Sequence, residues 1–402
     1  MRASNIDADR SGRFRHIVWP FAVAETVVWA SFFYLFPALL PEWEHSLGWS
    51  RTELSGAFSV ALMVSALLAP SIGHLIDRGF SRFVFPGCAL LGAVMLVALS
   101  QVNSLWQFFV VWAGLGVAMS GALYEACFAI VTRSMGKNSK RAITLITLAA
   151  GFAGTLSFPA AHAFVNLIGW RGAVLVFAAV VLIIAVPLLL YGCFHAERHF
   201  KNIPEQPDVN PITPRQVLRL PVFWLLVISF TAIALEHGSI ITHLLLILED
   251  RGVHQEAAIL AASMIGPMQV SGRLAMMAAE RHVSISGIAV GCFLALAGAA
   301  VCLLFAGGSA GLIAVFVILQ GGGNGMVSIV RPVITAELLG RRGFGMISGM
   351  IALPFMFGLA AAPTLAALVW QVGGYDLVIG LAVLFPLIGL SAFLAANKAA
   401  HR

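Results

Sequence analysis

Charged side chains are scarce in this chain: Asp, Glu, Lys and Arg together make up 10% of its 402 residues. A soluble globular domain carries about 25% charged residues, so the composition excludes a domain of that kind. Hydrophobic residues reach 60%, and the mean hydropathy is +0.93. The sequence therefore predicts an all-α membrane protein, because a helix satisfies its own backbone hydrogen bonds when lipid surrounds it.

Cysteine is also scarce, with five residues in the whole chain. All of them lie within or at the ends of apolar stretches: Cys88, Cys127, Cys193, Cys292 and Cys302. An odd number of thiols inside lipid predicts packing residues rather than disulfides. No pair has the spacing of metal ligands, since even Cys292 and Cys302 are separated by about 15 Å along a helix. We expect no metal site and no cofactor.

Sequence motifs for catalysis are missing as well. The chain has no Gly-x-x-x-x-Gly-Lys nucleotide loop, no His-Glu-x-x-His, and no Ser-His-Asp or paired-aspartate constellation. A membrane enzyme would need such a constellation at one interface, so we expect no enzymatic activity. A non-transporting membrane receptor is the alternative from another class. It would be expected to add a folded soluble domain or a long tail, whereas both tails here are short.

Twelve long apolar stretches make up most of the chain, and each can cross about 30 Å of hydrocarbon as a helix. The predicted spans are 17–40, 52–76, 83–102, 106–132, 142–168, 172–194, 222–248, 257–279, 284–305, 310–335, 344–370 and 375–396. The first is too long for the apolar region of a signal peptide, contains Glu25 and lacks a small-residue cleavage site.

Positive charge falls on one side of these spans. If the N-terminus is cytoplasmic, all but three of the 24 Lys and Arg lie in cytoplasmic segments, the exceptions being Arg51, Arg171 and Arg251. The positive-inside rule then places both termini in the cytoplasm and supports an even number of spans. The net charge of +6 follows from this topology, so it does not indicate nucleic-acid binding.

One polar, proline-containing segment divides the spans into two groups of six. Its composition predicts a cytoplasmic linker, within which Thr213 and Pro214 can begin a short interfacial helix. The predicted parts are an N-terminal cytoplasmic tail (1–16), a six-helix bundle (17–194), the linker (195–221), a second six-helix bundle (222–396) and a C-terminal cytoplasmic tail (397–402).

The two halves repeat several residues at a near-constant offset. Asp77-Arg78 with Ser81 recurs as Glu280-Arg281 with Ser284, 203 residues later. Gly136, Gly154 and Pro159 recur as Gly340, Gly358 and Pro363, 204 residues later. This pattern indicates two bundles related by pseudo-symmetry as parallel repeats.

The loop after the second span carries a family signature. Gly73-His-Leu-Ile-Asp77-Arg78-Gly79-Phe80-Ser81-Arg82 resembles the loop motif of the major facilitator superfamily, although it lacks one glycine-basic step of the usual pattern. In that family the glycine permits close helix contact and the aspartate caps a neighbouring helix, locking one conformation. The resemblance implies that Gly73, Asp77 and Arg78 form a conformational latch.

Further stretches resemble a bacterial efflux-permease branch related to monocarboxylate porters. They are Tyr124-Glu-Ala-Cys-Phe-Ala129, Arg141-Ala-Ile-Thr144, Gly169-Trp-Arg171, Gly266-Pro-Met-Gln269 and Asn324-Gly-Met-Val-Ser-Ile-Val-Arg331. The resemblance implies the superfamily's twelve-helix fold and a central cavity lined by the first, fourth, seventh and tenth spans. It does not name a cargo, because arsenite exporters and riboflavin importers share this scaffold.

Polar side chains are concentrated in those four spans. Ionisable groups at membrane depth are costly, so they are candidate functional groups. The candidates are Glu25 and Trp29 in the first span, Tyr124 and Glu125 in the fourth, Glu236, His237 and His243 in the seventh, and Gln320 and Asn324 in the tenth.

Three carboxyl groups are the predicted proton-coupling sites. Glu25 is followed at helical spacing by Trp29 and further aromatics, so it could bind cargo, or it could pair with a neighbouring helix. Glu125 can take up and release a proton if no cation lies beside it, and an ion pair with Arg133 is the competing role. Glu236 and His243 are seven residues apart and share a helix face that could relay protons.

The remaining candidates are predicted to contact the cargo. Gln320 and Asn324 flank three glycines, Gly321–Gly323, which let a substrate or another helix approach closely. Arg273 loosely matches the arginine that binds a carboxylate in monocarboxylate porters. Arg331 could contact cargo or pair with Glu337. For His237 and His162 we expect packing roles, each donating to a backbone carbonyl.

Together these features predict a secondary active transporter in the bacterial cytoplasmic (inner) membrane, acting as a monomer. Its partners would be the lipid bilayer, a small-molecule substrate, and protons or another coupling ion. Three carboxyl groups and nearby aromatics favour a neutral or cationic, planar organic cargo such as a vitamin, drug or metabolite. Riboflavin uptake, arsenite or toxic-compound export, and monocarboxylate transport are the alternatives.

Overall fold

The computed structural model describes residues 14–201, 213–307 and 309–400. The predicted N-terminal tail as far as residue 13, residues 202–212 of the predicted linker, and the last two residues lie outside the described part. Every described element is a helix, and no strand occurs among these residues. The prediction of an all-α chain is therefore confirmed.

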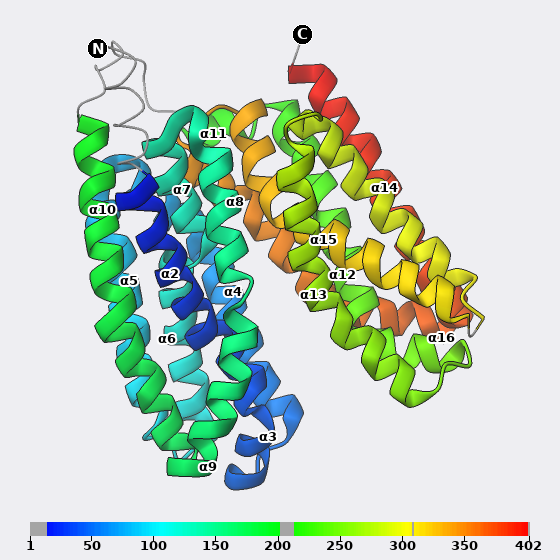
Figure 1. Ribbon diagram of the computed structural model, residues 1–402, viewed down its shortest axis with the longest axis horizontal. Coiled ribbons are helices and arrows are strands. Elements are labelled where there is room, and N and C mark those ends of the chain that lie inside the picture. The colour runs from blue at the N-terminus through cyan, green and yellow to red at the C-terminus, as the bar shows by residue number, and fades with distance from the viewer. Residues whose placement is uncertain (1–13, 202–212, 308, 401–402) are drawn as a thin grey trace. The chain divides into compact units, whose positions relative to one another are not determined.

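The chain forms two compact units. The first comprises Met1–Ile212 with Arg341–Met350, and the second comprises Thr213–Gly340 with Ile351–Arg402. Figure 1 shows the helices of each unit running alongside one another. The first unit contains α2 (Trp19–Val28), α3 (Leu35–Leu47), α4 (Arg51–Leu75), α5 (Ser81–Leu99), α6 (Leu105–Ala122), α7 (Tyr124–Met135), α8 (Ser139–Ala150), α9 (Ala153–Val180) and α10 (Val186–Lys201). The later helices are α11 (Pro214–Val217), α12 (Pro221–Asp250), α13 (Gln255–Ala279), α14 (Ile285–Leu304), α15 (Ala310–Leu338) and α16 (Phe344–Ala400).

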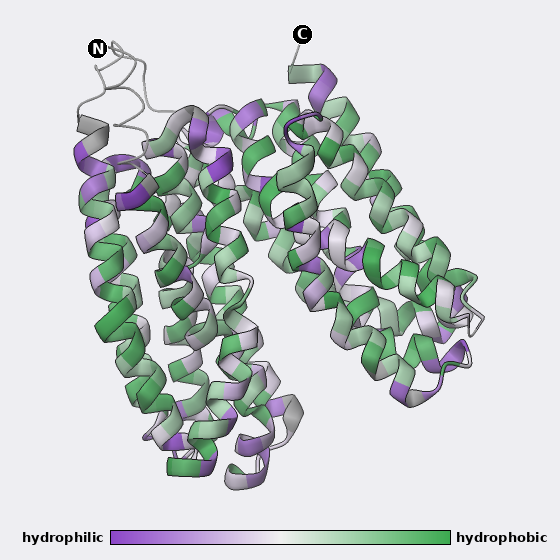
Figure 2. Ribbon diagram, in the orientation of Figure 1, coloured by the Kyte–Doolittle hydropathy of each residue, from purple (hydrophilic) through white to green (hydrophobic). Residues whose placement is uncertain are grey.

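Eight helical stretches of the described residues are long and apolar enough to cross a membrane. They are Arg15–Leu47, Glu53–Leu99, Leu105–Met135, Ser139–Arg198, Pro221–Asp250, Ile285–Leu304, Ala310–Leu338 and Phe344–Ala400. Figure 2 shows hydrophobic residues along the length of the helices and hydrophilic residues mainly towards their ends. The chain is a multi-pass membrane protein.

Three of these stretches are far longer than the roughly 20 residues that one crossing needs. They contain 47, 60 and 57 residues. Each includes a glycine in the left-handed region, namely Gly79 (φ 93°), Gly169 (φ 71°) and Gly374 (φ 66°). L side chains rarely adopt that conformation, so the chain changes direction there without leaving a long loop. These tight connections explain three mergers of neighbouring predicted spans, whereas the predicted span 257–279, which lies in α13, is not among the eight stretches.

Large aromatic side chains fill the core of the first unit at the end of α3. Trp43 and Trp112 are fully buried, and their ring centroids are 6.0 Å apart in an edge-on arrangement. Phe36 stacks on Phe58 at 4.4 Å and meets Trp112 edge-on at 4.9 Å. This cluster packs α3, α4 and α6 against one another.

Glycines let helices of the second unit approach backbone to backbone. A Cβ atom added to Gly325 of α15 would lie 2.2 Å from the carbonyl oxygen of Gln269 in α13. One added to Gly272 of α13 would lie 2.3 Å from the carbonyl oxygen of Gly322. The helix α15 is continuous through Gly321–Gly323, where Gly321 and Gly322 lie against α13 and Gly323 lies against α14.

Candidate functional site

Glu25 is fully buried near the middle of the first predicted span, on α2. Its closest polar neighbours are the thiol of Cys127 and the indole of Trp29. Neither carboxyl oxygen has a hydrogen bond within 3.5 Å among the described residues. An isolated buried carboxylate is costly by several kcal/mol, and the usual response of such a group is to bind a proton. Glu25 is therefore suited to hold an exchangeable proton.

An aromatic cluster lies beside Glu25. Directly after α2, residues Trp29–Tyr34 form a π-helical segment. Such segments are frequent at functional sites. The ring centroids of Trp29 and Tyr124 are 4.6 Å apart, and Tyr124 stacks on Phe128 at 5.0 Å and 13°. Two predicted cargo residues, Trp29 and Tyr124, are thus brought together in the first unit. Their flat faces can receive a planar or cationic group.

The helix that carries Tyr124 and Glu125 is interrupted directly before them. Leu123 has extended backbone angles (φ −106°, ψ −171°) and separates α6 from α7. The first N–H groups of α7 therefore begin a new helix at membrane depth, where they carry partial positive charge. Half-helix ends of this kind form substrate and ion sites in secondary transporters. This break is not predicted from the sequence, in which residues 106–132 form one uninterrupted apolar span.

Glu125 is partly exposed, and its Oε2 accepts a hydrogen bond of 2.7 Å from the Oγ of Ser348. Ser348 belongs to the segment Arg341–Met350, which is part of the first unit. The cation considered as the competing partner, Arg133, donates from Nη1 to the carbonyl of Ile76 at 2.6 Å. A side chain from a distant part of the sequence thus contacts the predicted proton group.

The motif residues Gly73 and Asp77 contact the same segment. Asp77 accepts the backbone N–H groups of Gly345 at 3.1 Å and Met346 at 2.9 Å, at the start of α16. A Cβ atom on Gly73 would lie 2.0 Å from the carbonyl oxygen of Gly345, so only glycine permits this approach. Arg78 is exposed.

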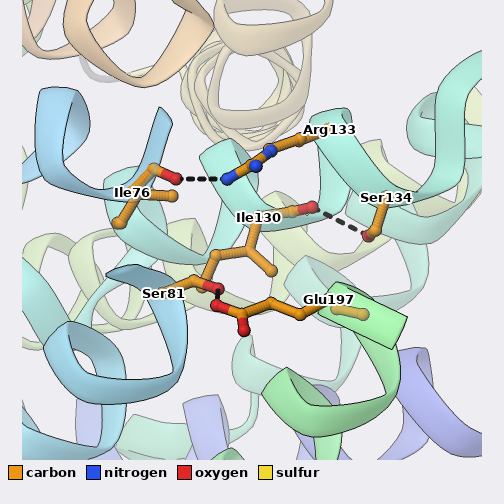
Figure 3. Close-up of a pocket in the computed structure, with 7 residues that line it drawn as sticks. Ile76, Ser81, Ile130, Arg133, Ser134 and Glu197 are labelled. Atoms are coloured by element: carbon orange, nitrogen blue, oxygen red, sulfur yellow. Dashed lines mark hydrogen bonds between the residues drawn. The ribbon is translucent and has the colours of Figure 1, made fainter. Parts of the chain in front are cut away.

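A small pocket lies at the start of α5, beside the short helical segment Ile76–Phe80, and its polar side chains make hydrogen bonds within the first unit. Figure 3 shows Glu197 of α10 accepting from the hydroxyl of Ser81 at 2.8 Å, and Arg133 donating to Ile76. Glu197 also accepts the backbone N–H of Arg82 at 3.2 Å, so it stabilises the first turn of α5. The sequence analysis assigns Glu197 to the linker and does not predict this role. Because its polar groups already hold helix ends, the pocket is not the cargo site.

The second unit has its own buried carboxyl group. Glu236 of α12 is fully buried, and neither oxygen has a hydrogen bond within 3.5 Å among the described residues. Its nearest polar neighbour is the side-chain amide of Gln320, which is also fully buried and lies on α15. Glu236 therefore resembles Glu25 in burial and in the lack of a charged partner within its unit.

His237 lies between two side-chain amides. The distance from its Nδ1 to Nε2 of Gln320 is 3.4 Å, and from its Nε2 to Nδ2 of Asn324 it is 3.1 Å. The predicted packing role, with a bond to a backbone carbonyl, is wrong for this residue. The amides are four residues apart on α15, so both present their side chains to the same ring. Glu236, Gln320 and Asn324 are thereby joined through a residue that sequence reasoning set aside.

The other histidine and the two arginines make contacts within the second unit. His243 places Nε2 3.2 Å from the carbonyl of Pro363. Arg273 is 7% exposed, and its Nε donates to the carbonyl of Gly325 at 3.3 Å. The guanidinium of Arg331 lies 4.5 Å from the centroid of the Phe355 ring. Among the described residues, no group of three His, Cys, Asp or Glu side chains converges as metal ligands.

The chain is similar to known proteins in sequence and in fold. The family model of the Major Facilitator Superfamily matches residues 21–299. A curated "MFS-type efflux pump" from Mycolicibacterium smegmatis (strain ATCC 700084 / mc(2)155) is 28% identical over 233 residues. That match covers 55% of this chain and 52% of the relative, so the chain spans about half the length of that protein.

Solved structures of transporters share the fold at low sequence identity. The human organic anion transporter MFSD10 (TETRAN) superposes with a TM-score of 0.70 at 16% identity, covering 96% of this chain and 99% of that one. FucP in the outward conformation gives a TM-score of 0.68 at 13% identity, covering 94% and 97%. A bacterial homologue of the iron transporter ferroportin gives 0.67 at 15%, covering 95% and 99%. Sequence identities this low show a shared fold but do not indicate which cargo the chain transports.

Proposed function

Because the chain belongs to the major facilitator superfamily, we propose that it is a proton-coupled secondary active transporter. It moves a small organic solute across the bacterial cytoplasmic membrane by alternating access. The proposal includes twelve spans in two six-helix bundles, both termini in the cytoplasm, and action as a monomer. The boundaries are those predicted from the sequence, with a linker at 195–221. Dividing the three overlong helices at their left-handed glycines gives eleven spans, and α13 (Gln255–Ala279) coincides with the remaining predicted span, 257–279.

The proposed proton coupling rests on one observation. Each unit holds a fully buried carboxyl group that has no hydrogen bond within 3.5 Å among the described residues. These are Glu25 in the first unit and Glu236 in the second. A neutral side chain would be less costly at both positions, so carboxyl groups there point to a role in reversible protonation. Glu125 is the third proposed proton group, and its bond to Ser348 links it to the start of α16.

For the cargo, we favour a neutral or cationic planar molecule. Glu25 lies beside the aromatic cluster of Trp29, Tyr124 and Phe128, which suits such a group. The two candidate anion-binding arginines are engaged inside their unit, Arg273 with Gly325 and Arg331 with Phe355. An organic anion therefore stands as the second candidate. The relative from M. smegmatis is an efflux pump, which favours export.

Flux measurements in proteoliposomes test this function. The purified chain is reconstituted, and ethidium, riboflavin, lactate and arsenite are offered as separate probes, with and without an imposed pH gradient. We expect ethidium or riboflavin to move, and the rate to depend on the gradient. Equal rates with and without the gradient would contradict proton coupling. Movement of lactate alone would shift the assignment to an organic anion.

A further inference from the structure

Four polar side chains lie next to one another in the second unit, with hydrogen-bond distances on both sides of His237 and none to Glu236. Glu236 lies beside Gln320, Gln320 contacts Nδ1 of His237, and Nε2 of His237 contacts Asn324. Glu236 and Gln320 are fully buried, whereas His237 and Asn324 are partly exposed. The row therefore runs from a titratable group that cannot reach water to an amide that can reach a solute.

The hydrogen-bonding capacity of His237 restricts how the row can be arranged. A neutral imidazole has one N–H donor and one bare nitrogen that accepts. An amide nitrogen lies opposite each ring nitrogen, at 3.4 Å for Gln320 and 3.1 Å for Asn324. The ring can accept from only one of them. The other amide satisfies the ring by rotating through 180°, which exchanges its nitrogen and its oxygen.

Gln320 lies between Glu236 and His237. Its Nε2 is 3.4 Å from Nδ1 of the ring, its Oε1 is buried without a hydrogen bond among the described residues, and its side-chain amide lies near the Glu236 carboxyl group. A carboxylate accepts only, whereas a protonated carboxyl group can donate. An ionised Glu236 can therefore accept only from the nitrogen end of Gln320, whereas a protonated Glu236 can also donate to its oxygen end.

We propose that Glu236 controls, through Gln320 and His237, whether Asn324 offers a donor or an acceptor to the solute. When Glu236 is ionised, Gln320 donates its NH2 group to both Glu236 and Nδ1. The proton of His237 is then on Nε2 and is donated to Oδ1 of Asn324. The NH2 group of Asn324 is left for the solute.

When Glu236 is protonated, each hydrogen bond along the row reverses its direction. Glu236 takes up one proton from solution, and its O–H group donates a hydrogen bond to Oε1 of Gln320. This oxygen also accepts a hydrogen bond from the N–H group at Nδ1 of His237. His237 loses its Nε2 proton and gains one at Nδ1, so its own proton count is unchanged. Its bare Nε2 accepts from the NH2 group of Asn324, whose oxygen then faces the solute. The partly exposed ring can exchange these protons with water.

Other charged groups of the second unit leave this row undisturbed. On α13, packed against α12, Arg273 donates to the carbonyl of Gly325. On α15, Arg331 lies over the ring of Phe355 from α16. Farther along α12, His243 contacts the carbonyl of Pro363, and its ring is 6.1 Å from that of Tyr375 on α16. Within the described part of this unit, the polar group acting on the Glu236 carboxyl is Gln320.

The row makes proton binding and solute binding compete. A solute carbonyl bonded to the NH2 group of Asn324 loses that bond when Glu236 takes up a proton, and linkage requires the reverse effect to be equal. Competition of this kind produces exchange of protons for solute, as an exporter needs. This consequence rests on the proposed function, whereas the row itself does not.

The tautomer of His237 is the direct readout. The full-length protein is labelled with 15N-histidine, placed in lipid nanodiscs, and followed by NMR from about pH 5 to pH 9, where buried carboxyl groups titrate. His237→Asn assigns the signals, with His237→Gln as the second choice if that variant does not fold. We expect the ring to stay neutral and to change from Nε2–H to Nδ1–H as the pH falls.

Two carboxyl variants distinguish the effect of Glu236 on the His237 tautomer from a general effect of pH. Glu236→Gln should keep one tautomer at every pH, whereas Glu280→Gln, in the same unit, should keep the change. Three results would each overturn the proposal. They are a doubly protonated His237 ring, a single His237 tautomer at every pH in the unmodified chain, and a change of tautomer with pH that persists in Glu236→Gln. No solute is needed, so failure here is distinct from failure of the flux experiment.

Discussion

The hydroxyl of Ser348 donates a hydrogen bond of 2.7 Å to Oε2 of Glu125. Glu125 is the second residue of α7, directly after the break at Leu123, and Ser348 follows the start of α16. Asp77 binds the backbone of the same segment at Gly345 and Met346. Glu125 and Asp77 therefore both contact the segment Arg341–Met350 of the first unit.

Glu125→Gln should abolish transport driven by a pH gradient while leaving solute exchange. Glutamine keeps the volume and an oxygen that accepts from Ser348, but it cannot release a proton. Gradient-driven uptake and counterflow of ethidium or riboflavin in proteoliposomes measure the two activities. The exposed Glu256→Gln serves as the matched control and should retain both. Unaltered gradient-driven uptake in Glu125→Gln would remove this carboxyl group from the mechanism.

Glu25→Gln should uncouple transport without unfolding the first unit. The two side chains have the same shape, so we expect stability to change by less than about 1.5 kcal/mol. Thermal unfolding of the purified variant measures this change, and flux with and without a pH gradient measures the coupling. The control Glu53→Gln alters an exposed residue that accepts from Ser50 at the start of α4. A Glu25→Gln protein whose flux still follows the gradient would contradict the assignment.

Gly73→Ala tests the close approach of α4 to the start of α16. The added Cβ atom would lie 2.0 Å from the carbonyl oxygen of Gly345, so a backbone must shift, at a cost of about 1–3 kcal/mol. Gly87→Ala is the control, because its Cβ atom has no neighbour within 4 Å and alanine favours a helix by about 0.5–1 kcal/mol. The thermal midpoint should fall for the first variant and stay or rise for the second. Equal midpoints would show that this contact does not stabilise the protein.

The all-helical, multi-pass architecture was predictable from the sequence because the length of an apolar stretch is a local property. The helix start at Pro214, with Thr213 before it, also follows the prediction. The backbone break at Leu123 was not predictable. Gly121 lies two residues before it and weakens a helix locally, but glycines elsewhere in the spans, such as Gly321–Gly323, lie in unbroken helix, so the sequence does not single out this position.

The candidate site was predictable in part. Sequence placed Glu25 with Trp29 and Tyr124 on spans expected to meet, and the rings lie 4.6 Å apart. It did not place Ser348 beside Glu125, since 223 residues separate them. His237 was set aside because it is turned about 100° from Glu236 on the same helix. The amides of Gln320 and Asn324 reach across to it, and a helical wheel of one helix cannot show that.

Proton movement during solute flux is the most direct test of the central claim. A pH-sensitive dye is sealed inside proteoliposomes, and ethidium or riboflavin is added outside. The account predicts a change of internal pH with the unmodified chain. It predicts no such change with the double variant Glu25→Gln and Glu236→Gln, although solute exchange continues. An internal pH change of the same size in both would contradict the claim that these two buried carboxyl groups carry the coupled protons.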